Sequence, residues 1–222
     1  MRRVFALGAA LAFAALLFTN PAAAGAAADE RGDLLQRAAA TMQKAKVDPI
    51  FANARSRLDQ AKAVIIVPAL TRGGFIFGAE GGSGVLLART PDGMWSDPVF
   101  VTLGGASFGL QAGVDSSEVV MLLMSDQSLA AVTRSGFRFG AGAGLTMVTL
   151  GASAGAATGD IIIWAASRGG IYGGLTLDGS VINIRDDWNQ SFYGRRVDAS
   201  EILSGRVRSS GPNPVAQQLA SQ

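Results

Sequence analysis

The 222-residue chain contains neither histidine nor cysteine. It therefore lacks the commonest general base, the strongest side-chain nucleophile and the main side-chain ligands for zinc, copper and haem. Without cysteine the fold has no disulfide bonds, so its stability must come from packing. We accordingly expect a protein that is not an enzyme and has no catalytic residue, metal site or cofactor, and we look for its function in surfaces and pockets.

Two segments match the Gly-x-Ser-x-Gly pattern of the hydrolase nucleophile elbow: Gly105-Ala106-Ser107-Phe108-Gly109 and Gly151-Ala152-Ser153-Ala154-Gly155. In such an enzyme a histidine activates the serine, and the elbow joins a strand to a helix. This chain has no histidine, and both matches fall in runs of glycine and alanine. We interpret these residues as small side chains that let strands pack closely.

The N-terminus has the pattern of a secretory signal peptide. Arg2-Arg3 precede an apolar run over residues 4–18, and the small residues Ala22-Ala23-Ala24 follow. As a helix this run would span about 22 Å, which is less than the roughly 30 Å core of a bilayer. We expect residues 1–24 to be removed, with cleavage after Ala28 as the alternative. The mature protein would then be exported to the periplasm, either free or peripheral on a membrane.

The net charge becomes zero once this segment is removed. The whole chain has 19 Lys and Arg against 17 Asp and Glu, and Arg2 and Arg3 account for the difference. A neutral protein has no general attraction to nucleic acid or to an anionic membrane. We therefore expect no nucleic-acid partner, and any attraction to an anionic surface must come from local grouping of cations.

Residues 25–61 have the pattern of two amphipathic helices. Between residues 29 and 46, Leu34, Ala38 and Met42 recur at helical spacing. Asp48-Pro49 then supplies an N-cap and a first-turn proline for a second helix. We expect both helices to cover the sheet that follows, with a helix lying on a membrane surface as the alternative.

Residues 62–205 form the expected β-rich core. Apolar runs at residues 64–67, 119–123 and 161–164 have the length of strands and predict strands covered on both faces. Turn residues at Pro91-Asp92-Gly93 and Asp178-Gly179 indicate hairpins, so the sheet should be mostly antiparallel.

Short helices are expected late in the chain. Residues 126–134 should form one, capped by Asp126, and the spacing of Asp198 and Glu201 matches a capping box that begins another. Residues 206–222 should form a tail, because they contain two prolines and a glycine close together. The predicted fold class is α+β: an antiparallel β-rich core, sheet or barrel-like, with two N-terminal amphipathic helices and a short C-terminal helix.

Eight segments rich in glycine, aromatic and turn residues follow one another in a defined order: residues 61–68, 72–78, 81–85, 91–98, 104–113, 169–174, 177–180 and 189–194. This order resembles the SYLF domain, a lipid-binding family of exported bacterial proteins and eukaryotic membrane-trafficking proteins. The resemblance implies phospholipid binding, with phosphoinositides as ligands and actin as a partner of some eukaryotic members. For an exported chain it implies association with phospholipid or an anionic membrane surface in the cell envelope, and protein partners stay unknown.

Arginine suits phosphate recognition, because its planar guanidinium can donate two parallel hydrogen bonds, and the chain has 16 Arg against 3 Lys. Arg72 and Arg168 each stand beside two glycines, where bare backbone leaves room for a headgroup. Arg134 stands near the position of a lysine in the family's pattern. The basic residues of the two helices would each contribute about 1 kcal/mol at an anionic surface. The expected lipid-binding residues are Arg37, Lys44, Lys46, Arg55, Arg57, Lys62, Arg72, Arg134 and Arg168.

Two other classes of function stay open. Export, high glycine content and strands of similar length also suit a small outer-membrane β-barrel, but the apolar runs would then face a polar lumen. A carboxylate-based hydrolase is the second alternative, since paired Asp or Glu residues can hydrolyse glycosides without histidine. Its candidates are Glu80, Asp160, Asp186 and Asp187, but the last two are adjacent and would point to opposite faces of a strand.

Overall fold

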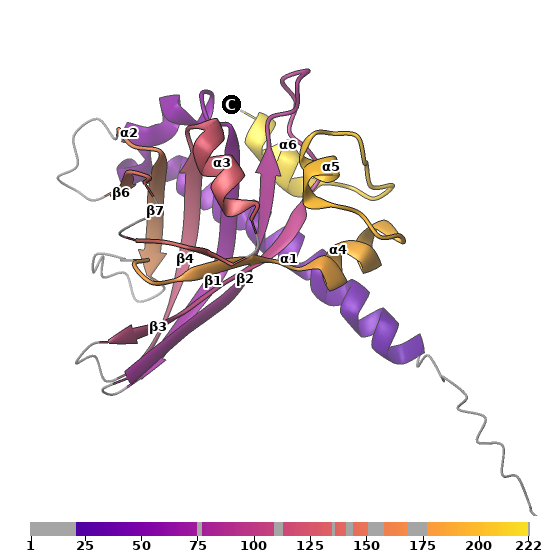
Figure 1. Cartoon of the computed structure of the whole chain (residues 1–222), viewed down its shortest axis with the longest axis horizontal. Helices are drawn as coiled ribbons and strands as arrows, with labels where there is room; N and C mark the ends of the chain where they lie inside the picture. Colours follow the sequence, from indigo (N-terminus) through magenta and orange to yellow (C-terminus); the bar gives the residue numbers. More distant parts are fainter. Residues whose placement is uncertain are drawn as a thin grey trace, which may run out of the picture.

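The computed structural model describes residues 21–74, 77–108, 113–134, 136–140, 144–150, 158–167 and 177–221. A curled eight-stranded sheet forms the centre, and helices lie on both of its faces (Figure 1). The predicted α+β class is confirmed. Arg168 and the second Gly-x-Ser-x-Gly segment lie outside the described residues.

The sheet has the strand order β5-β8-β3-β2-β1-β4-β7-β6. Neighbouring strands are antiparallel except for β6 and β7, which are parallel. The prediction of a mostly antiparallel sheet is therefore confirmed. The strands are β1 (Ala63–Gly74), β2 (Phe77–Ala88), β3 (Val99–Phe108), β4 (Gly113–Leu123), β5 (Phe137–Arg138), β6 (Met147–Thr149), β7 (Ile161–Ser167) and β8 (Val181–Ile184).

The central strands are buried on both faces, as their unbroken apolar runs predict. Side chains alternate along a strand, so Val64 and Ile66 of β1 face one core, while Ile65 and Val67 face the other. Each of these four side chains is at most 1% exposed.

The first core lies between the sheet and helices α1 (Pro21–Val47), α2 (Pro49–Leu58) and α6 (Pro214–Ala220). The predicted stripe of α1 is buried, including Leu34, Ala38 and Met42. α2 begins as predicted, because the Asp48 carboxylate accepts a hydrogen bond of 2.7 Å from the Ile50 N–H. Phe51 of α2 meets Trp164 of β7 edge to face, with ring centroids 6.4 Å apart. Burial of these side chains fixes both helices on the sheet.

The second core lies on the other face, under α3 (Asp126–Val132), β5 and α5 (Ala199–Leu203). α5 begins with the predicted capping box of Asp198 and Glu201. For α3 the predicted cap was wrong by one residue: Ser125 is the N-cap, and its hydroxyl accepts from the Ser128 N–H at 3.1 Å. The Ser128 hydroxyl in turn accepts from the Ser125 N–H, an exchange that Asp126 has no part in.

Two helices stand where the sequence predicts none. α4 (Asp186–Tyr193) begins one residue after β8 and packs on β3, with the Asn189 side chain accepting from the Phe100 N–H at 2.9 Å. α6 lies within the predicted tail and buries Val215 and Leu219 against α1. Both helices are short, so most of their stability comes from tertiary packing, which local sequence patterns do not reveal.

A bulge divides β1 into two parts. The register of β1 shifts between Ile66 and Thr71 against β2, and a shift also occurs against β4. At the bulge the β1 backbone crowds Gly82 and Gly84: a Cβ on Gly84 would lie 2.6 Å from the Ile66 carbonyl oxygen. Beyond the bulge, β1 to β4 continue together away from the body of the molecule, toward the lower left of Figure 1. We call residues 70–74, 77–81, 104–108 and 113–117 the sheet arm.

Candidate functional site

The basic residues at the junction of α1 and α2 close helix ends. The Lys46 ammonium donates to the backbone carbonyls of Gln218 and Ser221 at the end of α6. Arg55 donates to the Lys46 carbonyl at the end of α1. Cations are favourable at these positions because helix C-termini carry partial negative charge. Burial and the nearby Arg55 lower the pKa of Lys46, and Asp59 opposes them. Lys46 and Arg55, both predicted lipid ligands, thus form hydrogen bonds within the fold.

The other predicted cations of this region are exposed, apart from the half-buried Arg57, and most are paired. Arg37 lies 2.8 Å from Asp33, and Lys62 lies 3.5 Å from Asp126. Lys44 of α1 pairs with Glu118 of β4. Arg57 donates at 3.2 Å to the neutral Gln60 side chain. Pairs this exposed contribute little stability, so these cations can exchange partners with an external anion.

Arg72 and Glu80 form an ion pair where the sheet arm joins the body. They are register partners on β1 and β2, and Arg72 Nε lies 2.6 Å from Glu80 Oε2. The Ser180 hydroxyl, just before β8, donates to the other carboxylate oxygen. Gly105 makes this contact possible, because a Cβ there would lie 3.0 Å from Ser180 Cα. The predicted headgroup ligand Arg72 is therefore held by a buried carboxylate.

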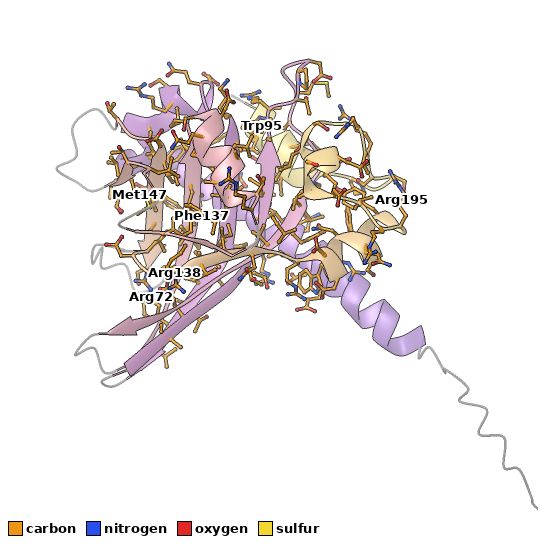
Figure 2. The ribbon with its side chains drawn as sticks, in the orientation of Figure 1. Arg72, Trp95, Phe137, Arg138, Met147 and Arg195 are labelled. Atoms are coloured by element: carbon orange, nitrogen blue, oxygen red, sulfur yellow. The ribbon has the colours of Figure 1, made fainter. Side chains whose placement is uncertain are left out.

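A second arginine, which the sequence analysis missed, contacts the same segment. Arg138 of β5 donates at 2.8 Å to the Gly179 carbonyl, next to Ser180. Arg72 and Arg138 lie on the same side of the molecule (Figure 2). No carboxylate of the described residues lies within ion-pair distance of Arg138, which is exposed. The sequence held a signal, since Arg138 stands between Phe137 and Phe139, but only the β5–β8 pairing brings it to the segment that contacts Glu80, the partner of Arg72.

Arg134 is exposed just after α3, and Arg195 and Arg196 are exposed after α4. Arg195 lies on the right-hand side of the molecule in Figure 2, far from Arg72 in that view. The described cations thus do not gather into one surface. The arginine pair of Arg72 and Arg138 lies at one end of β1, and the helix-closing pair of Lys46 and Arg55 lies near the other.

Comparison with known proteins gives the family. The model described as "Ysc84: Las17-binding protein actin regulator" matches residues 104–222, which is more than half of the chain. The chain belongs to the Ysc84 (SYLF) family. The resemblance drawn from the order of its segments is confirmed.

The curated relatives of this SYLF chain are longer proteins. Protein YSC84 of Saccharomyces cerevisiae is 34% identical over 158 residues, which make up 68% of this chain and 34% of that protein. LAS seventeen-binding protein 3 of the same species is 33% identical over 169 residues, 73% of this chain and 36% of the relative. SH3 domain-containing YSC84-like protein 1 of Bos taurus is 32% identical over 160 residues, 67% and 45% respectively. The match thus spans about a third to just under half of each relative.

The carboxylates considered for hydrolysis have structural partners in this SYLF protein. Glu80 is the ion-pair partner of Arg72. Asp160 accepts from the Ser125 hydroxyl at 2.8 Å and the Thr146 N–H at 3.0 Å, and these bonds lower its pKa. Asp187 pairs with Arg185 at 2.9 Å, and its pKa is also lowered. A general acid needs a raised pKa, so neither aspartate suits that role.

The strand geometry assumed for Asp186 and Asp187 was wrong, because both lie in the first turn of α4. Acidic residues are favourable there, next to the positive end of the helix dipole. Gly105, Ala106, Ser107 and Phe108 lie within strand β3, where no strand-to-helix elbow forms. Among the helices that the structure describes, none is long and apolar enough to cross a membrane.

Proposed function

We propose that this SYLF protein is a non-enzymatic module that binds phospholipid headgroups at an anionic membrane surface of the cell envelope. The observation that carries the proposal is the arginine pair at the root of the sheet arm. Arg138 is exposed, and its guanidinium donates to a backbone carbonyl rather than to a carboxylate. Its positive charge is therefore available to a lipid phosphate.

Arg72 is the second, partly buried cation of the same site. Its side chain is 26% exposed, and the buried Glu80 carboxylate fixes the guanidinium through Nε. Glu80 thereby holds the guanidinium at the base of the sheet arm, beside the Gly179–Ser180 segment that Arg138 contacts. Fixing the side chain in advance also reduces the entropy lost when the headgroup binds.

The predicted residues on the helices form a second candidate surface. Arg55 and Arg57 stand on α2, near the start of β1, whereas the sheet arm is its far end. Arg72 in the arm stands nine residues after Ala63, the start of β1, about 30 Å away if the strand were straight. One flat membrane would engage one end or the other, and we favour the arm because Lys46 and Arg55 already close helix ends.

Vesicle flotation with phosphatidylglycerol tests the proposal. We expect binding to weaken as salt rises and the Arg138→Gln variant to bind about fivefold more weakly, equivalent to about 1 kcal/mol. Arg206→Gln, at an exposed position away from the arm, is the control and should bind like the wild type. Loss of binding in Arg57→Gln instead would move the site to the helices. Equal binding to neutral phosphatidylcholine at every salt concentration would contradict the proposal.

The cellular location of the protein distinguishes this proposed function from a second candidate. The names of the relatives describe Las17 binding and actin regulation, and a partner of that kind would require a chain that stays inside the cell. Buried residues that fix α1, such as Leu34 and Met42, follow both expected cleavage points, so removal of the leader leaves that packing intact. N-terminal sequencing should find a mature chain that starts at residue 25 or 29 in the periplasmic fraction. An intact N-terminus in the cytoplasm would favour the protein-binding alternative.

A further inference from the structure

The turn over residues 177–180 carries the carbonyl group that holds Arg138. The Ser180 N–H donates to the Leu177 carbonyl at 2.9 Å, which closes the turn. Gly179 has a φ of +85°, in the left-handed region that favours glycine. Its carbonyl accepts a hydrogen bond of 2.8 Å from Nη1 of Arg138. The direction of this carbonyl, and with it the position of the Arg138 guanidinium, therefore depends on how the turn is held.

On one side the turn is held by β5 and the residue that follows it. The Gly179 N–H donates to the Phe139 carbonyl, and the Phe139 N–H donates to the Ser180 carbonyl, both at 2.8 Å. Phe139 is buried and meets Phe137 of β5 edge to face, with ring centroids 5.1 Å apart. Because backbone bonds and a buried ring join them, β5 and the turn form one unit.

On the other side the Ser180 side chain reaches the sheet arm. Its hydroxyl donates to Oε1 of Glu80, and Arg72 donates to Oε2 of the same carboxylate at 2.6 Å. Ser180 and Glu80 are both buried. A hydroxyl that donates to a carboxylate forms a charge-assisted hydrogen bond, about twice as strong as a neutral one. This bond therefore links the turn to the Arg72–Glu80 pair.

Gly105 of β3 fixes how closely the turn approaches the arm. A Cβ on Gly105 would lie 3.0 Å from Ser180 Cα, closer than the optimum of about 3.5–4.0 Å between carbon atoms. The same Cβ would lie 3.3 Å from the Ser180 hydroxyl oxygen. Ser180 thus packs directly against the glycine backbone, and its bond to Glu80 keeps it from moving away.

We propose that Ser180 is a positioning residue of the headgroup site: its bond to Glu80 sets the Gly179 carbonyl, and that carbonyl sets the guanidinium of Arg138. This inference rests on the proposed function, which assigns the positive charge of Arg138 to a lipid phosphate. Ser180 is buried, so it acts through Arg138 rather than by contact with the headgroup. A guanidinium that is fixed before binding loses less conformational entropy when the anion binds.

Flotation with phosphatidylglycerol vesicles tests the proposal. Ser180→Ala should weaken binding about threefold, because the guanidinium loses its fixed position while its charge stays. Ser167→Ala is the matched control: it removes another hydroxyl that donates to a carboxylate of the arm, Asp115, at 2.9 Å, and should bind like the wild type. Gly105→Ala should also weaken binding, because its Cβ displaces Ser180. Gly81→Ala, whose Cβ would have no described neighbour within 4 Å, should not.

A double-mutant cycle separates positioning from a general loss of stability. If Ser180 acts through Arg138, the variant that combines Ser180→Ala with Arg138→Gln should bind as Arg138→Gln does, with no further loss. Proton exchange at the Arg138 guanidinium, followed by NMR, gives a second readout that needs no lipid. This exchange should be faster in Ser180→Ala than in the wild type, because the bond to the Gly179 carbonyl is held less firmly.

The outcomes distinguish this inference from the proposed function. If the wild type binds vesicles and Ser180→Ala binds equally well, the positioning role is wrong while headgroup binding stands. Losses that add in the double variant would also overturn the positioning role, because Ser180 would then act independently of Arg138. If the wild type binds no vesicle, the proposed function fails, and the headgroup role of Ser180 fails with it.

Discussion

Arg72 Nε lies 2.6 Å from Glu80 Oε2, across the β1–β2 register, and joins the most buried carboxylate among the described ion pairs to a partly exposed guanidinium. The Glu80 side chain is 4% exposed, against 26% for Arg72. Removing one partner of such a pair leaves an uncompensated buried charge, which is more costly than losing an exposed pair. The pair therefore stabilises the base of the sheet arm.

Substitutions of Arg72 and of Glu80 should lower the stability of the fold by different amounts. Arg72→Gln leaves the buried Glu80 carboxylate without its cation and should lower the free energy of unfolding by about 2–3 kcal/mol. Glu80→Gln keeps a hydrogen-bonding group for Ser180 and should cost less. Urea unfolding measures both. Asp33→Asn, which breaks the exposed Arg37–Asp33 pair, is the control and should cost at most about 0.5 kcal/mol. Equal effects at the two pairs would contradict the buried role of Glu80.

The glycines opposite the β1 bulge should be intolerant of a side chain. Gly84→Ala places a Cβ 2.6 Å from the Ile66 carbonyl oxygen, and Gly82→Ala places one against the Ala69 carbonyl. Backbone cannot move aside as a flexible side chain does, so each change should lower the free energy of unfolding by about 1–3 kcal/mol. Gly81→Ala is the matched control, because its Cβ would have no neighbour within 4 Å. Thermal unfolding of the three variants compares them directly, and a strongly destabilised Gly81→Ala would count against the geometry.

Asp160 should contribute to stability in a pH-dependent way. Hydrogen bonds from Thr146 and Ser125 lower its pKa in the folded protein. A carboxyl group whose pKa is lower in the folded than in the unfolded state stabilises the fold above the unfolded value. That contribution is lost as pH falls through the folded pKa. Asp160→Asn should therefore be less stable than the wild type at about pH 7, and the difference should shrink toward about pH 3. A difference that is constant over this range would show that the charge of Asp160 has no part in it.

The last residues of the chain should matter for folding. Leu219 is 4% exposed and packs with α6 against α1, so Leu219→Ala should lower the free energy of unfolding by about 2–4 kcal/mol. Gln217 lies on the exposed side of the same helix, and Gln217→Ala should have little effect. Chemical denaturation of both variants tests whether α6 is part of the core. Full stability of Leu219→Ala would restore the interpretation of residues 206–222 as a tail.

Elements with a local signal were predicted well. Asp48 starts α2 through a bond to a backbone N–H two residues away, and the Asp198–Glu201 capping box lies within four residues. The apolar runs of β1, β4 and β7 predicted burial on both faces, because a strand with one wet face would alternate. Each of these signals depends on neighbours in sequence, so no knowledge of the fold was needed.

Elements fixed by distant partners were missed. α4 depends on the Asn189–Phe100 hydrogen bond and on ring contacts of Phe100 with Trp188 and Phe192, at centroid distances of 5.7 and 5.1 Å. The hydrogen-bond partners of the cations were not predicted for the same reason. Lys46 and Arg55 were expected to face a membrane, but carbonyl groups at the ends of α6 and α1 accept their hydrogen bonds.

The sequence by itself determined the absence of imidazole and thiol chemistry, the two opening helices, the strand-forming runs and the family. These follow from composition and from short-range patterns, which persist in whatever way the chain packs. Only the tertiary structure decided which cations close helix ends, and that Arg138 and the Arg72–Glu80 pair contact the same Gly179–Ser180 segment. The contacts of that segment depend on strand order and register, which bring together residues that are 41 to 100 positions apart in the sequence. Local sequence patterns do not predict contacts between residues so far apart.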